Sequence, residues 1–220
     1  MKNLQQELDS ILTEILNKIT DNAFIKVLSN ALDREKLLKD ILGDLLAFAQ
    51  KDPAAKGESR NILYGYTSYK AILYYRIAHS ILLINTDNFS FNEKKYQYAL
   101  MLSAKGKLLS GAEINPFAKI GARFVLDHGI GTVIGETAEI GDDNYILGGV
   151  ILGARGISGN PKEARHPKLG NNVQIGSFAK LFGPINIGDN VFIGANCMVT
   201  EDIPANHSVL LKSENQIIRS

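Results

Sequence analysis

The chain has 220 residues, of which 45% are hydrophobic and 21% are charged, and its formal net charge is +1. This composition fits a globular protein with a sizeable core, and it gives no bulk field for binding nucleic acid or an anionic membrane. Cys197 is the only cysteine, which excludes an internal disulfide and fits a reducing compartment. The N-terminus has acids where a signal peptide needs an apolar core, and no apolar run is long enough to span a bilayer. We therefore expect a cytoplasmic protein.

Residues 1–110 show the pattern of amphipathic helices. They contain only four glycines, and their apolar residues recur every three or four positions. The pattern predicts one helix over 4–19 and a second that begins after Asp33, a good N-cap residue. The second helix should end near Asp52, because the residue before Pro53 is disfavoured in a helix. Two more helices are predicted over 67–83 and 92–109, so residues 1–110 are expected to form an α-helical domain.

After Ser110 the apolar residues recur with a period of six. The hexads start at Ile114, Ile120, Leu126, Ile134, Ile140, Ile146, Leu152, Leu169, Ile175, Leu181, Ile187, Ile193 and Val199. A small or medium-sized residue often stands at the fifth place, as at Ala118 and Cys197. Such a repeat is typical of a parallel β-helix, in which three hexads make one triangular coil with the starters inside. We expect this β-helix over 111–206, followed by a tail over 207–220.

Two interruptions break the period. Leu126 and Ile134 are eight residues apart, so two extra residues are accommodated beside His128. Leu152 and Leu169 are seventeen residues apart, which predicts a loop extruded from the coil over 153–168. Insertions in solenoids map to loops on one face, often the binding face, and a longer loop costs little entropy. Functional residues are therefore expected at these two places.

Six stretches have counterparts in one known family. They are KDPAA (51–55), GYTSYKAILYYRIAH (65–79), EINPFAKIG (113–121), VLDHGIGTVIGETAEIG (125–141), ARHPK (164–168) and IGSFAKLFGPINIG (175–188). In sequence and order they resemble the serine O-acetyltransferases, which are hexapeptide-repeat acyltransferases. The resemblance implies an α+β fold, with an N-terminal α-helical domain followed by a left-handed parallel β-helix of hexapeptide repeats. It also implies a homotrimer, or a dimer of trimers joined through an oligomerisation domain at 1–110, with active sites between neighbouring β-helices.

The resemblance implies acetyl transfer from acetyl-CoA, a co-substrate, to the hydroxyl of L-serine, which gives O-acetylserine for cysteine biosynthesis. An alcohol is a poor nucleophile at neutral pH, so a base must take its proton, and an imidazole with a pKa near ~6.5 suits this task. By resemblance His128 is the base. Glu113 falls where the family has the aspartate that orients the imidazole and stabilises its charged form.

The substrate is a zwitterion and needs opposite charges at its two ends. By resemblance Asp52 and Asp127 receive the ammonium group, while Arg165 and His166 hold the carboxylate and hydroxyl end. The candidate coenzyme contacts are small residues along the coil edges, namely Gly153, Ala154, Ala179, Gly183 and Ala195. No metal site is predicted, because zinc enzymes on the same scaffold need three histidines, and only His128 and His166 lie inside the repeats.

The chain departs from the family in several places. GARGI (153–157) stands where the family has GGTGK, and residues 160–164 include an insertion. The last residues lack the isoleucine by which family members dock into cysteine synthase, so that complex is not predicted. Two alternatives stay open: transfer to another acceptor, such as homoserine or a sugar or antibiotic hydroxyl, and a non-catalytic β-helix that assembles or binds a partner. Asp127 and His128 are expected to point to opposite sides of their strand, with His128 facing Glu113.

Overall fold

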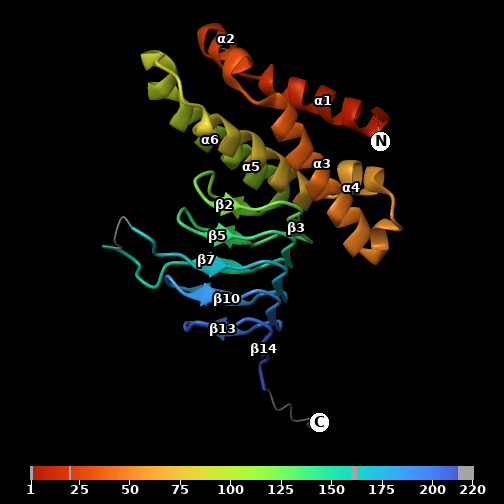
Figure 1. Cartoon of the computed structure of the whole chain (residues 1–220), viewed down its shortest axis with the longest axis vertical. Coiled ribbons are helices and arrows are strands. Elements are labelled where there is room, and N and C mark those ends of the chain that lie inside the picture. Colours follow the sequence, from red (N-terminus) through yellow and green to blue (C-terminus); the bar gives the residue numbers. More distant parts are fainter. Residues whose placement is uncertain (1, 20, 160–162, 213–220) are drawn as a thin grey trace, which may run out of the picture.

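The computed structural model describes residues 2–19, 21–159 and 163–212, and Figure 1 shows helices above one end of a stack of short strands. The helical part comprises α1 (Lys2–Leu16), α2 (Asn22–Ala31), α3 (Arg34–Lys51), the 3-10 turn η1 (Pro53–Ala55), α4 (Ser59–Gly65), α5 (Thr67–Leu83) and α6 (Phe89–Ser110). The four helices expected from the periodicity are present, and α2 and α4 were not expected. Within the described ranges no helix is long and apolar enough to cross a lipid bilayer.

Side-chain caps begin three of the helices. Asp21, Asp33 and Asn88 accept hydrogen bonds from backbone N–H groups in the first turns of α2, α3 and α6. The N-cap expected at Asp33 is therefore confirmed, and α3 ends as expected just before Asp52 and Pro53. Helix α2 was missed because it is short and, in the structure, buries only Phe24 and Leu28, too few to show a periodic stripe.

Short parallel strands follow the helices. They are β1 (Glu113–Ile114), β2 (Lys119–Ile120), β3 (Val125–Leu126), β4 (Val133–Ile134), β5 (Glu139–Ile140), β6 (Tyr145–Ile146), β7 (Ile151–Gly153), β8 (Lys168–Leu169), β9 (Gln174–Ile175), β10 (Lys180–Phe182), β11 (Asn186–Ile187), β12 (Phe192–Ile193), β13 (Met198–Val199) and β14 (Ser208–Val209). Every hexad starter is the second residue of one of these strands, and its side chain is buried. The period of six therefore predicted the position of every strand from β1 to β13.

Three parallel sheets form the faces of the triangular coil. Their strand orders are β1-β4-β7-β10-β13, β2-β5-β8-β11 and β3-β6-β9-β12-β14. Strands one coil apart pair in register, as with Ile114 opposite Ile134 and Ile134 opposite Leu152. Strand β14 pairs with β12 beyond the boundary expected at 206, so parallel pairing continues into the segment expected to be the tail. Residues 213–220 of that tail lie outside the described residues.

A buried ion pair fastens the helices to the first coil. Arg76 of α5 donates to Asp44 of α3, with Nε 2.8 Å from Oδ2, and both side chains are almost fully buried. Arg76 also donates to the carbonyl oxygens of Ile120 and Gly121, while Asp44 accepts from the N–H of Phe124. Burial raises the pKa of Asp44, although the charge of Arg76 acts against this shift. The pair sets how α3 lies against the coil.

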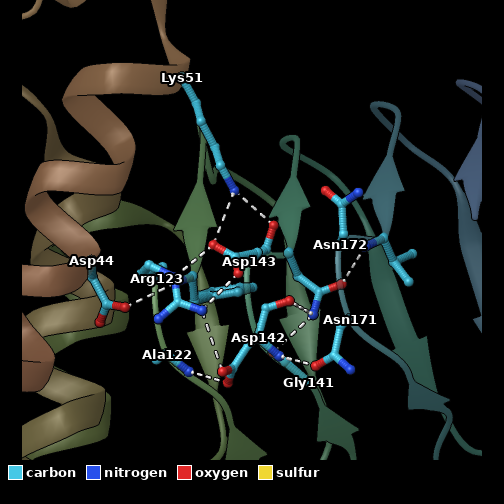
Figure 2. Close-up of polar contacts among 12 residues, drawn as sticks. Asp44, Lys51, Ala122, Arg123, Gly141, Asp142, Asp143, Asn171 and Asn172 are labelled. Carbon is cyan, nitrogen blue, oxygen red and sulfur yellow. Dashed lines mark hydrogen bonds and ion pairs between the residues drawn. The ribbon is translucent and has the colours of Figure 1, made fainter. Parts of the chain in front are cut away.

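A second attachment lies at one corner of the coil, where Figure 2 shows Lys51 reaching from the end of α3 to Asp143. Lys51 Nζ donates to the backbone oxygen of Asp143 at 2.7 Å. The Asp143 carboxylate accepts two hydrogen bonds from the guanidinium of Arg123, and these hold its pKa below the usual range. In the same corner, Asp142 accepts from the N–H of Ala122 at 2.8 Å. Because Lys51, the last residue of α3, is bonded to the coil, the position of the next residue, Asp52, is fixed as well.

Candidate active site

Three of the expected site residues meet in one pocket of about 330 Å³ between the helices and the coil. Asp52 follows α3, and Asp127 and His128 follow β3; all three line the pocket. Tyr66 and Ser68, near the start of α5, complete the helical side. The structure therefore brings the expected base together with both carboxylates expected to bind the substrate ammonium group.

The turn with the two extra residues presents His128 to the pocket. His128 has a φ of 60°, in the left-handed region that residues other than glycine rarely adopt, and Gly129 follows with a φ of 71°. A Cβ atom on Gly129 would lie 2.9 Å from Cβ of Ser68, so both the conformation and the space require glycine. The side chain of His128 is 77% exposed, which leaves its ring nitrogens accessible to a substrate.

The expectation that Asp127 and His128 point to opposite sides is wrong. Both line the pocket, and Nε2 of His128 lies 3.9 Å from Oδ2 of Asp127. The alternation of side chains holds along a strand, but β3 ends before Asp127, and the left-handed turn at His128 brings the two side chains to one side. The Asp127 carboxylate is largely buried beneath the exposed imidazole.

Two tyrosines reach the carboxylates, and sequence reasoning missed both as site residues. Tyr145 on β6 donates its hydroxyl proton to Oδ2 of Asp127 at 2.9 Å. Burial is the main reason that the pKa of Tyr145 rises above its ordinary value, and this hydrogen bond adds to the shift. A hydrogen bond with Asp52 likewise raises the pKa of Tyr66. The period of six could have indicated Tyr145. It places Tyr145 one coil beyond Val125, opposite a residue that stands two positions before Asp127.

Glu113, the expected orienting carboxylate, has a different partner in this chain. It is the first residue of β1, and its half-exposed carboxylate forms an ion pair with Lys107 of α6. Among the hydrogen bonds of the described residues, none joins Glu113 to His128. The pairing of Glu113 with His128 thus stays a prediction.

Arg165 and His166 lie at another corner of the coil and do not line this pocket. Arg165 forms an ion pair with Glu136, and the buried His166 ring accepts a hydrogen bond at Nδ1 from the N–H of Thr137. Burial and the charge of Arg165 lower the pKa of His166, which favours its neutral form. A Cβ on Gly135 would lie 2.1 Å from the His166 ring, so glycine is required there. Residues 135–137 therefore anchor the returning end of the extruded loop, of which 160–162 lie outside the described residues.

The small residues expected to contact the coenzyme have different environments. Gly183, with a φ of 93°, donates its N–H to the carbonyl oxygen of Gly153 on the preceding coil. The side chain of Arg155 covers Gly183 and donates to the backbone oxygen of Thr200. Ala154 is half-buried and Ala195 is exposed, whereas the methyl group of Ala179 is fully buried in the core of the coil.

Comparisons with known proteins agree with this architecture. Residues 166–201 match the family described as bacterial transferase hexapeptide (six repeats). The serine acetyltransferase of Helicobacter pylori is 42% identical over 165 residues, which cover 75% of this chain and 89% of the relative. That of Staphylococcus aureus is 38% identical over 174 residues, 79% of this chain and 75% of the relative.

Two solved structures extend the comparison to the fold. Isoform 3 of the Entamoeba histolytica serine acetyltransferase, in complex with cysteine, has a TM-score of 0.73 and 28% identity. The match covers 100% of this chain and 72% of the Entamoeba chain. The Neisseria gonorrhoeae serine acetyltransferase has a TM-score of 0.74 and 33% identity. The match covers 89% of this chain and 70% of the Neisseria chain. The expected α+β fold, a helical domain followed by a left-handed β-helix, is confirmed.

The repeats and the fold define the chain as a hexapeptide-repeat acyltransferase, and it is an enzyme. Its identity to curated relatives over most of their length places it more narrowly. The chain belongs to the serine acetyltransferase family.

Proposed function

We propose that the enzyme transfers the acetyl group of acetyl-CoA to the hydroxyl of L-serine, with His128 as the general base. The observation that carries this proposal is the pocket in which an exposed imidazole stands beside two largely buried carboxylates. The serine oxygen attacks the thioester carbonyl carbon while the imidazole takes the hydroxyl proton. When the C–S bond breaks, the imidazolium gives its proton to the leaving sulfur, and the products are O-acetylserine and coenzyme A.

Asp52 and Asp127 bind the ammonium group of serine in this proposal. Both are among the few buried charged residues, and together they give the pocket a negative charge next to the base. A buried carboxylate gains most from a cation that arrives with hydrogen-bond donors of its own, and a primary ammonium group is such a cation. A neutral sugar or antibiotic has no charge to pair with these residues, which is why an amino acid is favoured over such an acceptor.

The carboxylate end of serine is bound by Arg165 and His166 of a second copy of the chain. In one chain these residues and His128 lie at two different corners of the coil. In a homotrimer of β-helices, corners of neighbouring copies meet, so one pocket can contain both sets. Acetyl-CoA then lies along the coil edge at Gly153, Ala154 and Ala195. Acetyl-CoA as co-substrate and a single cysteine also support a cytoplasmic location.

The test is a thiol-release assay with acetyl-CoA and a panel of serine, homoserine and threonine. We expect turnover with serine, and a loss of about 100-fold or more in kcat for His128→Ala. His207→Ala is the matched control, because His207 is exposed on the far coil and, among the described residues, its ring Nδ1 hydrogen-bonds to the carbonyl oxygen of Ala205 alone. Turnover with homoserine alone would change the assigned acceptor, and no turnover with any acceptor would contradict the proposal.

A further inference from the structure

One oxygen of Asp127 faces two groups. Its Oδ2 accepts the hydrogen bond from the Tyr145 hydroxyl at 2.9 Å and lies 3.9 Å from Nε2 of His128. Its Oδ1 accepts no hydrogen bond from the part of the chain that the structure describes. The carboxylate therefore has one oxygen held by the protein and one oxygen left for a ligand in the pocket.

The fold holds the Tyr145 hydroxyl in place. Tyr145 is the first residue of β6 and pairs in register with Val125 of β3, so its backbone is fixed by the coil. Its ring packs against the core of the helical part, to which Val125 also belongs. Burial, the hydrogen bond to Asp127 and the negative charges of Asp127 and Asp52 all raise the pKa of Tyr145. The phenol thus keeps its proton and donates it to Asp127 throughout the neutral pH range.

We propose that Tyr145 is a positioning residue for the acetyl transfer, which acts by holding Oδ2 of Asp127. This inference rests on the proposed function, in which Asp127 binds the substrate ammonium group and His128 is the base. The hydrogen bond directs Oδ1 into the pocket, where it meets the ammonium group. It also keeps Oδ2 from turning toward the imidazole.

The second effect matters because Oδ2 of Asp127 lies 3.9 Å from Nε2 of His128, and a closer approach would occupy a ring nitrogen of the base. The charged and titratable groups that face Asp127 are Tyr145 from β6, His128 from the turn, and Asp52 and Tyr66 from the helical side. Of these, Tyr145 is the group that donates to the same oxygen that faces the imidazole. Without this donor, Oδ2 is free to turn toward His128.

The decisive variant is Tyr145→Phe, which removes the hydroxyl and keeps the ring. We expect the KM for serine to rise about fivefold, the effect of one hydrogen bond, while the KM for acetyl-CoA does not change. The matched control is Tyr69→Phe: the buried Tyr69 hydroxyl donates to the backbone oxygen of Ile41, so its loss lowers stability and leaves both KM values in place.

A double-mutant cycle with Asp127→Asn shows whether Tyr145 acts through Asp127. We expect Tyr145→Phe to raise the serine KM in the wild-type background and to add nothing in the Asp127→Asn background. If Asp127→Asn raises the serine KM but Tyr145→Phe behaves like Tyr69→Phe, the role of Tyr145 is refuted and the proposed function stands. If the wild type does not acetylate serine, or Asp127→Asn leaves the serine KM unchanged, the assignment of the pocket itself fails.

Discussion

At the residue scale, His128 combines a left-handed backbone conformation, which other turn residues such as Arg123 and Asn190 share, with high exposure. The left-handed φ of 60° costs free energy in a residue other than glycine, and the pairing of coils on both sides holds the chain in that conformation. The result is an imidazole that projects over the pocket while its neighbour Asp127 stays largely buried. One turn thus separates an accessible base from a protected carboxylate.

Glu113 provides the sharpest test at this scale. If it orients His128 during catalysis, Glu113→Gln should lower kcat by about tenfold or more and leave the serine KM nearly unchanged, because it removes charge that the imidazolium needs in the transition state. Lys107→Met is the paired variant: it removes the ion-pair partner of Glu113 and should not lower kcat. Steady-state kinetics of both variants decide the matter, and an undiminished kcat in Glu113→Gln would assign the carboxylate to the Lys107 ion pair alone.

At the element scale, α3 positions the site from a distance. Its buried Asp44 pairs with Arg76, and its last residue, Lys51, donates to the coil. Asp44→Asn should lower the free energy of unfolding by about 3 kcal/mol, because the variant leaves the buried Arg76 charge without a counter-ion. Urea unfolding measures this loss. Lys36→Met, which removes an exposed ion pair with Asp40, should cost less than about 1 kcal/mol, and equal losses in the two variants would contradict the assigned role.

Two histidines in different elements predict how stability depends on pH. Burial lowers the pKa of the half-buried His79 on α5 and of the buried His166 in the returning loop. The unfolded chain, with histidines near ~6.5, therefore binds protons more readily than the folded chain, and stability must fall as the pH drops below that value. Above a pH of about 6.5 these histidines are neutral in both the folded and the unfolded chain, and their full contribution to stability is present. We expect the free energy of unfolding to decrease between about pH 7 and pH 5, and more weakly in His166→Gln; a flat wild-type profile would contradict this.

At the scale of the whole molecule, the two halves of the proposed site lie at different corners of one coil. His128→Ala and Arg165→Ala should each inactivate the enzyme, but subunits of the two variants mixed by denaturation and refolding should recover activity. If each site takes His128 from one copy and Arg165 from another, random mixing restores about one quarter of the wild-type activity. The measurement is the thiol-release rate of the refolded mixture against each variant refolded alone. No recovery would show that the site lies within one chain.

The period of six, a property of the sequence alone, determined much of the fold. Each coil must bury one aliphatic side chain per face, so the hexad starters located every strand from β1 to β13, and the two breaks located the turn at His128 and the extruded loop. The resemblance to known enzymes named Asp52, Asp127 and His128, which do share one pocket. These features were predictable because they depend on local spacing or on short motifs.

Only the tertiary structure decided how the pocket is assembled. The contacts of Tyr145 and Tyr66 with the two carboxylates join different elements, and the placement of Asp127 and His128 on one side depends on a backbone torsion. The pairing of Glu113 with Lys107 spans only six residues, but it depends on how the end of α6 meets β1. A hydrophobic period specifies which side chains must be buried, whereas a polar contact between distant segments depends on how helices dock on the coil. The sequence by itself therefore determined the scaffold and its breaks, and the docking of the helices determined the chemistry of the site.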